Sequence, residues 1–140
     1  MMTEHPHLLE RFVTAQASVY ATALSEIRQG AKRSHWMWFI FPQLAVLGRS
    51  QRAQYYGIRS LGEAKAYLEH PVLGPRYIAC ATALEDLPTS DPVAVFGQID
   101  AIKLRSSLTL FEAARSEPLF GRALDRWFCG ERDSLTLKAL

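Results

Sequence analysis

The chain is poor in cysteine and carries no targeting segment that we recognise. Its two cysteines, Cys80 and Cys129, have neither the spacing of a zinc site nor a C-x-x-C motif. Each lies in an apolar helical pattern, so we expect two buried free thiols, as in a protein of a reducing compartment. The N-terminus lacks the basic-then-apolar pattern of a signal peptide. Both observations predict a cytoplasmic protein.

Net charge, long apolar runs and cofactor motifs are also scarce. A balance of 16 Lys and Arg against 14 Asp and Glu leaves a net charge of +2, which does not favour a nucleic-acid partner. The longest apolar run, Trp36–Phe41, is too short to cross a bilayer, so we expect no membrane partner. Phosphate-loop, dinucleotide and metalloprotease motifs are absent, and the histidines lack ligand spacing, so we expect no cofactor and no metal. The composition does not distinguish a monomer from an oligomer.

Helical periodicity is what the sequence has in abundance. Apolar residues recur at helical spacing along most of the chain, and the connections between these segments are short. The one continuous apolar run has no second strand to pair with. We therefore predict an all-α fold, with residues 1–140 forming a single compact domain of about six to eight helices and residues 1–6 a mobile tail.

The clearest helix is predicted from about Leu8 to Ile27, ended by Gly30. Its polar face is interpreted as an ordinary solvated surface that carries Glu10, Arg11, Glu26 and Arg28. Further helices are expected over 51–58, 60–68, from Pro71 or Pro75 to about 87, over 93–96, 100–114 and 119–129, and at the C-terminus. Ser50 is expected to cap the first of these, a Ser60-to-Glu63 capping box the second, and Asp133 or Ser134 the last.

The segment Lys32–Gln43, K-R-S-H-W-M-W-F-I-F-P-Q, is the first candidate site. It is too aromatic for a surface loop and too polar at its start for core, and it favours a buried irregular segment or a short helix. Aromatic walls with a few convergent polar groups are typical of a ligand pocket. The predicted ligand-binding residues here are Lys32, Arg33, Trp36, Trp38 and Gln43. His35 is the candidate catalytic acid or base, with Asp100, Glu10 or Glu112 as a carboxylate partner. The alternative is that the aromatic side chains are simply core.

Two further stretches could bind an anion. Lys103, Ser106 and Ser107 lie within one turn of a predicted helix, and hydroxyls beside a cation suit phosphate or carboxylate. These residues could equally serve helix packing, with Lys103 paired only to Asp100. Arg49, which precedes the expected cap of a short helix, is a third and smaller candidate.

Several unusual strings resemble domain-of-unknown-function family 1810. They are H-W-M-W-F-I-F-P-Q, L-G-R-S, A-Y-L-E-H-P-V-L-G-P-R, F-G-Q-I-D-A-I-K-L-R-S-S-L-T-L-F and D-S-L-T-L. The likeness covers nearly the whole chain and implies a small, helical, bacterial protein of the cytoplasm. Some members of that family carry the label calpastatin, which nothing in this chain supports.

The order of these segments is also similar to that of the NADAR N-glycosidase family. The shared outline is a helix like E-A-K-A-Y-L, a helix like K-L-R-S-S-L-T-L-F and a terminal D-S-L-T-L. That similarity implies action on ADP-ribose-type glycosidic bonds, although the acidic residues of that family have no clear counterpart here.

Three functions therefore compete at this point. The first is a protein that binds an anionic, nucleotide-like molecule in a Trp-, His- and Lys-lined pocket, with a small hydrolase as its catalytic form. The second is a non-catalytic module whose exposed indoles engage a protein partner. The third is a structural tryptophan cluster with the function elsewhere, and N-glycosidase-like activity is a variant of the first.

Overall fold

The computed structural model describes residues 6–140, which form helices joined by turns and loops. Their ten α-helices and one 3-10 turn are α1 (Pro6–Ala17), α2 (Tyr20–Gln29), α3 (Met37–Ile40), η1 (Ala45–Leu47), α4 (Gln51–Tyr55), α5 (Leu61–Glu69), α6 (Leu73–Glu85), α7 (Pro92–Phe96), α8 (Gln98–Ala114), α9 (Pro118–Phe128) and α10 (Ser134–Ala139). The predicted all-α class is confirmed. The helices outnumber the expected six to eight because the first predicted helix is divided in two and α3 forms as well. Most of the predicted tail lies outside the described residues, and Pro6 begins α1.

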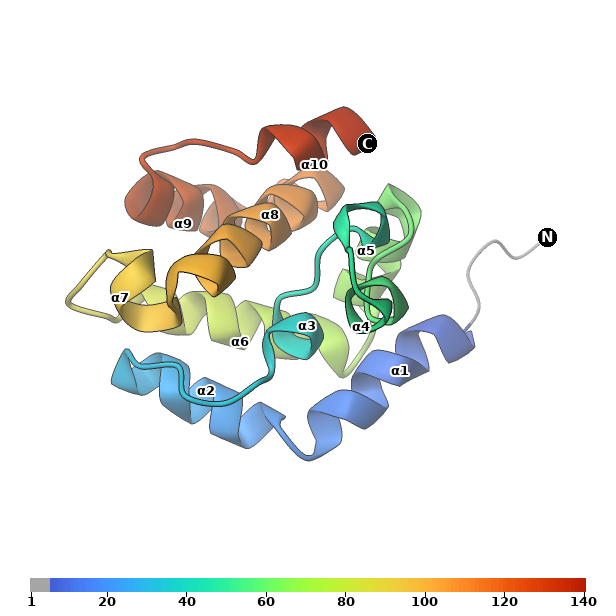
Figure 1. Cartoon of the computed structure of the whole chain (residues 1–140), viewed down its shortest axis with the longest axis horizontal. Coiled ribbons are helices and arrows are strands. Elements are labelled where there is room, and N and C mark those ends of the chain that lie inside the picture. Colours follow the sequence, from blue (N-terminus) through green and yellow to red (C-terminus); the bar gives the residue numbers. More distant parts are fainter. Residues whose placement is uncertain (1–5) are drawn as a thin grey trace.

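Helices α6 and α8 form the centre of the molecule (Figure 1). Helix α8 contacts α5, α7, α9 and α10, while α6 contacts α2, α5 and α9. Between them lies an aromatic core in which the ring of Tyr77 is 4.3 Å from that of Phe111 and 5.4 Å from that of Phe120, between ring centroids. Edge-on and tilted ring contacts of this kind add to the free energy of burial. The longest helix is therefore buried over residues 106–111, and its two ends reach the surface.

The long helix predicted over residues 8–27 is broken at Ser18 and Val19, where α1 and α2 meet at an angle (Figure 1). Gln16, on the last turn of α1, is buried and donates from Nε2 to the Phe39 carbonyl (2.7 Å) and to the Tyr67 hydroxyl (3.0 Å). These contacts are remote in sequence. The apolar periodicity continues across the break, so the sequence pattern could not show it.

The prediction of a solvated polar face on this helix is wrong for Arg11 and Glu26, which are both buried. Arg11 donates to the carbonyls of Tyr55 (2.6 Å) and Gly57 (2.7 Å) and pairs with Glu63 (3.3 Å). Burial of a charge is tolerated only when such partners replace water. The partners come from distant segments and therefore leave no local signal. Glu10 and Arg28 are exposed, as expected.

The predicted helix caps are confirmed in most details. Ser50 Oγ accepts from Ala53 N–H and Ser60 Oγ accepts from Glu63 N–H, each at 3.0 Å. The Glu63 carboxylate, however, accepts from the N–H of Arg59 instead of Ser60, so the capping box is not reciprocal. Of the two residues proposed for the last helix, Asp133 is the cap and accepts from Thr136 N–H at 3.0 Å.

The two cysteines differ in their surroundings. Cys80 is buried in α6 as predicted, and burial raises the pKa of its thiol to about 12. Cys129 is exposed, which contradicts the prediction. It ends α9 in a left-handed conformation with φ of 55°, so its side chain leaves the apolar face that the helical pattern suggested. No helix within residues 6–140 has the length and apolar character needed to cross a membrane.

Candidate functional site

Helix α3 is a single turn that divides the aromatic segment into two halves. Its own residues Met37 and Ile40 are buried, at the i and i+3 positions that share one helix face. Trp36, directly before the helix, is completely buried, with 0 % of its surface exposed. Trp38, two residues later, is only partly buried. The short helix is thus what sends the two indoles into different environments.

The buried half is organised by Glu26 of α2. Its carboxylate accepts from the N–H groups of Arg33 (2.8 Å) and Ser34 (3.0 Å), from Ser34 Oγ (2.6 Å) and from Trp36 Nε1 (2.9 Å). Burial by itself would raise the pKa of Glu26, but these hydrogen bonds outweigh burial and lower its pKa to about 2. An ionised carboxylate therefore fixes the start of the aromatic segment.

Trp38 faces a surface pocket with a volume of about 360 Å³, which we call the Trp38 pocket. It lies between the η1–α4 region and the first turns of α8. Its lining residues are Trp38, Gln43, Leu47, Gly48, Arg49, Ser50, Ala53, Ile99, Ile102 and Lys103. The pocket therefore unites all three sequence stretches that were predicted to bind a ligand.

The wall that carries Arg49 and Ser50 is a closed loop. Its two ends are joined at a short β-bridge between Leu44 and Ile58. The N–H of Ile58 donates to the Gln43 carbonyl (2.7 Å), and the N–H of Ala45 donates to the Ile58 carbonyl (2.8 Å). Gly57 packs so tightly on Ala45 that a Cβ there would lie 2.3 Å from Ala45 Cα. Glycine is thus required for this close approach. The two ends of the loop that carries Arg49 and Ser50 are therefore held together.

The pocket is positively charged on its α8 side. Lys103 Nζ is 4.4 Å from the centre of the Trp38 ring, and the Arg52 guanidinium is 5.5 Å from the same ring. Asp100 is shared between Lys32 Nζ (2.9 Å) and Lys103 Nζ (3.6 Å), so one carboxylate faces two ammonium groups. Trp38 Nε1 is buried and has no hydrogen-bond partner among the described residues. The cations and the indole N–H around Trp38 therefore outnumber the carboxylate groups that pair with them.

A family model describes this pattern of residues along nearly the whole chain. The model for a protein of unknown function, DUF1810, matches residues 6–140. The chain belongs to the DUF1810 family. Among curated proteins, none matches it.

A solved structure is similar to this DUF1810 domain from end to end. It is the crystal structure of the conserved hypothetical protein Rv1873 from Mycobacterium tuberculosis, which is 44 % identical in sequence and superimposes with a TM-score of 0.94. The match covers 97 % of this chain and 98 % of that chain. Neither description names a ligand or a reaction.

Four of the predicted ligand-binding residues of the DUF1810 domain line the Trp38 pocket: Trp38, Gln43, Arg49 and Lys103. The other six candidates lie outside it. Lys32 is held by Asp100 and by the Ser34 carbonyl (2.6 Å), and Arg33 is exposed beside Glu26. These two cations thus belong to the Glu26 side of the segment.

The hydroxyl candidates and the indole of Trp36 are turned inward. Ser106 and Ser107 are buried, and Ser107 Oγ is hydrogen-bonded to the Tyr77 hydroxyl at 2.9 Å. His35 is exposed at the turn before Trp36. Of the three carboxylates considered as its partners, Asp100 binds two lysines, Glu112 binds Arg132 at 2.6 Å, and Glu10 is exposed on α1.

The sequence pattern did not identify Arg52, Ile99 and Ile102 as neighbours of this site. Ile99 and Ile102 are 71 % and 55 % exposed. A signal was available for the isoleucines, because they lie three residues apart beside Lys103, off the face that carries Leu104 and Leu108. For Arg52 there was none, because its contact with Trp38 arises only in the folded chain.

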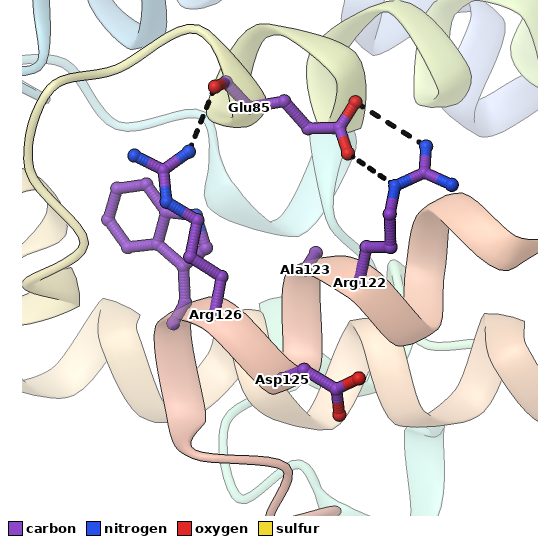
Figure 2. A pocket seen from close by; sticks show the side chains of 6 residues that line it. Glu85, Arg122, Ala123, Asp125 and Arg126 are labelled. Atoms are coloured by element: carbon purple, nitrogen blue, oxygen red, sulfur yellow. Dashed lines mark hydrogen bonds and ion pairs between the residues drawn. The ribbon is translucent and has the colours of Figure 1, made fainter.

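The DUF1810 domain has a second pocket, of about 440 Å³, between α6 and α9. Figure 2 shows Arg122 and Arg126 of α9 reaching toward Glu85. Arg122 Nε binds the Glu85 carboxylate at 2.7 Å, which lowers the pKa of that group. Arg126 donates to main-chain carbonyls at the end of α6, including those of Leu84 (3.2 Å) and Glu85 (2.9 Å). Both cations are already satisfied, so this pocket joins two helices and is the weaker candidate for an anion.

Proposed function

We propose that this DUF1810 chain binds a small anionic molecule in the Trp38 pocket. The observation that carries the proposal is the meeting of Arg49 and Lys103, from separate segments, in a cavity whose described lining contains no carboxylate. Asp100, which pairs with Lys103, is shared with Lys32. The net charge at the pocket is therefore positive, which favours an anion.

The polar groups of the pocket suit a phosphate or a carboxylate. Lys103 and Arg49 supply charged donors, and Gln43 and Ser50 supply neutral donors at the same cavity. Hydrogen bonds to an ionised acceptor are about twice as strong as those between neutral groups. A volume of about 360 Å³ lies within the range of small-molecule sites, which begins at about 300 Å³.

The pocket favours binding over hydrolysis. An acid–base step needs a titratable group near the reacting atoms. The described lining residues include no histidine and no carboxylate, and His35 is exposed before Trp36. The same composition gives no support for N-glycosidase chemistry on ADP-ribose-type compounds. A protein-interaction module that displays its indoles is favoured less as well, because Trp36 is buried and Trp38 is partly covered.

A thermal-shift screen tests the proposal with inorganic phosphate, adenosine monophosphate and glucose 6-phosphate. A ligand at a hundred times its Kd stabilises the folded chain by about 2.7 kcal/mol and should raise the melting temperature by several degrees. Lys103→Gln should abolish the shift.

The matched control is Lys65→Gln, since Lys65 is an exposed lysine on α5 outside the pocket. It should keep the full shift. If no anion shifts the melting temperature, or if Lys103→Gln responds like the parent chain, the pocket is not an anion site.

A further inference from the structure

We propose that the anion bound in the Trp38 pocket is an amphiphile, with a phosphate-like head and an aliphatic group. This inference rests on the proposed function and extends it to the uncharged part of the ligand. It is carried by two features of the same cavity, which are exposed isoleucines on its α8 wall and a Trp38 ring that cations already cover.

The α8 wall presents aliphatic side chains next to Lys103. Ile99 and Ile102 line the pocket although 71 % and 55 % of their surfaces are exposed, and they lie on the first turns of the helix. Leu47 and Ala53 extend this apolar lining on the opposite wall. Exposed apolar side chains that gather at a cavity, rimmed by polar residues, are typical of a binding surface. An alkyl group beside the anionic head would cover them.

The ring of Trp38 is poorly placed to stack an aromatic base. Lys103 Nζ and the Arg52 guanidinium lie over it at 4.4 and 5.5 Å from the ring centre. A planar group would compete with these cation–π contacts for the indole surface. Lys103, which contacts the ring, also lines the pocket, where it attracts an anionic head. Trp38 therefore serves the charged part of the ligand and the isoleucines serve the uncharged part.

Titration calorimetry with a homologous series tests this division. The probes are inorganic phosphate, ethyl phosphate, butyl phosphate and hexyl phosphate, with adenosine monophosphate as the planar competitor. Burial of one methylene contributes up to about 0.8 kcal/mol, which is about a fourfold gain in affinity. We expect affinity to rise about two- to fourfold per methylene up to the length that the pocket holds. Hexyl phosphate should bind more tightly than adenosine monophosphate.

Variants separate the two parts of the ligand. The double variant Ile99→Gln, Ile102→Gln changes exposed positions only and should flatten the dependence of affinity on chain length. Lys103→Gln should weaken every member of the series. The matched control is Val93→Gln on α7, where an apolar side chain is 51 % exposed but does not line the pocket. It should behave as the parent chain does.

The outcomes distinguish this inference from the proposed function. If phosphate binds but affinity is flat along the series, or if adenosine monophosphate binds more tightly than hexyl phosphate, the amphiphile is wrong and the anion site stands. If nothing in the series binds, the proposed function fails. Vesicles that contain phosphatidic acid provide a separate arm. Sedimentation with the vesicles without binding of any soluble alkyl phosphate would replace the free small molecule by a lipid surface and overturn the inference.

Discussion

Trp36 and Trp38 stand two residues apart in the chain and have different surroundings in the fold. Trp36 is fully buried, and its Nε1 donates to Glu26 at 2.9 Å. Trp38 is partly exposed at a pocket, and its Nε1 has no partner among the described residues. Lys32, 5.0 Å from the Trp36 ring, is neutralised by Asp100, whereas Lys103 over Trp38 shares that carboxylate at a longer distance.

This difference between the two indoles shows that the aromatic segment is not one functional unit. In a helical turn, two residues apart means roughly 200° around the axis, so neighbouring indoles point to opposite sides. The Glu26 side satisfies its polar groups internally, which is typical of a structural element. The pocket side leaves the Trp38 N–H without a partner among the described residues, and this side carries the proposed anion site.

The largest effect is expected from Trp36→Ala. Removal of a fully buried indole should lower the free energy of unfolding by about 3–5 kcal/mol, because the transfer free energy is lost and a cavity remains. Trp38→Ala should cost clearly less, because part of that ring is already in water. Urea unfolding of both variants measures the difference. Equal losses would show that the two indoles are equally part of the core.

The second-largest effect is expected in an acid titration, which measures how much the Glu26 carboxylate contributes to stability. The pKa of Glu26 is lowered from 4.5 to about 2 in the folded chain, so its contribution to stability is present above the unfolded pKa and lost as pH falls. The shift corresponds to about 3 kcal/mol, lost between about pH 5 and pH 2.

The matched variant for this titration is Glu26→Gln, which lacks the charge. It should be less stable than the parent chain at pH 7, and the gap between the two should narrow as pH falls toward 3 in urea unfolding. A gap that stays constant over this range would mean that the Glu26 carboxylate is not the group that titrates.

The smallest effects, and the sharpest comparison, come from two phenylalanine variants. Trp36→Phe removes a donor from a buried carboxylate and should cost about 1–3 kcal/mol. Trp38→Phe removes a donor that has no partner within residues 6–140 and should stay within about 0.5 kcal/mol of the parent chain. Thermal and urea unfolding provide the values. A large loss for Trp38→Phe would show that its N–H is satisfied within the fold.

Local signals predicted much of the fold. The serine caps at Ser50 and Ser60 and the stop at Gly30 are decided by side chains within four residues, so the sequence identifies them directly. The break between α1 and α2 escaped prediction because Gln16 finds its partners, Phe39 and Tyr67, only after distant segments pack together.

The candidate site was predicted only in part, because packing between distant segments decides which side chains reach the pocket. Trp38, Gln43, Arg49 and Lys103 were named from residue type and spacing, and the fold brings them to one cavity. Residue type alone also suggested Ser106, Ser107 and Trp36, which packing turned inward. Hydroxyls and indoles serve a core and a pocket equally well, so only burial distinguishes the two uses.

The sequence by itself determined the helical class, the positions of most helix ends and the family, because periodicity, capping and motif strings are properties of short segments. The tertiary structure alone decided that Arg11 and Glu26 are buried, that the two indoles separate, and that α8 joins the loop after α3 at one pocket. These outcomes depend on contacts between residues far apart in the chain, and a hydrogen bond or an ion pair across that distance has no trace in local pattern.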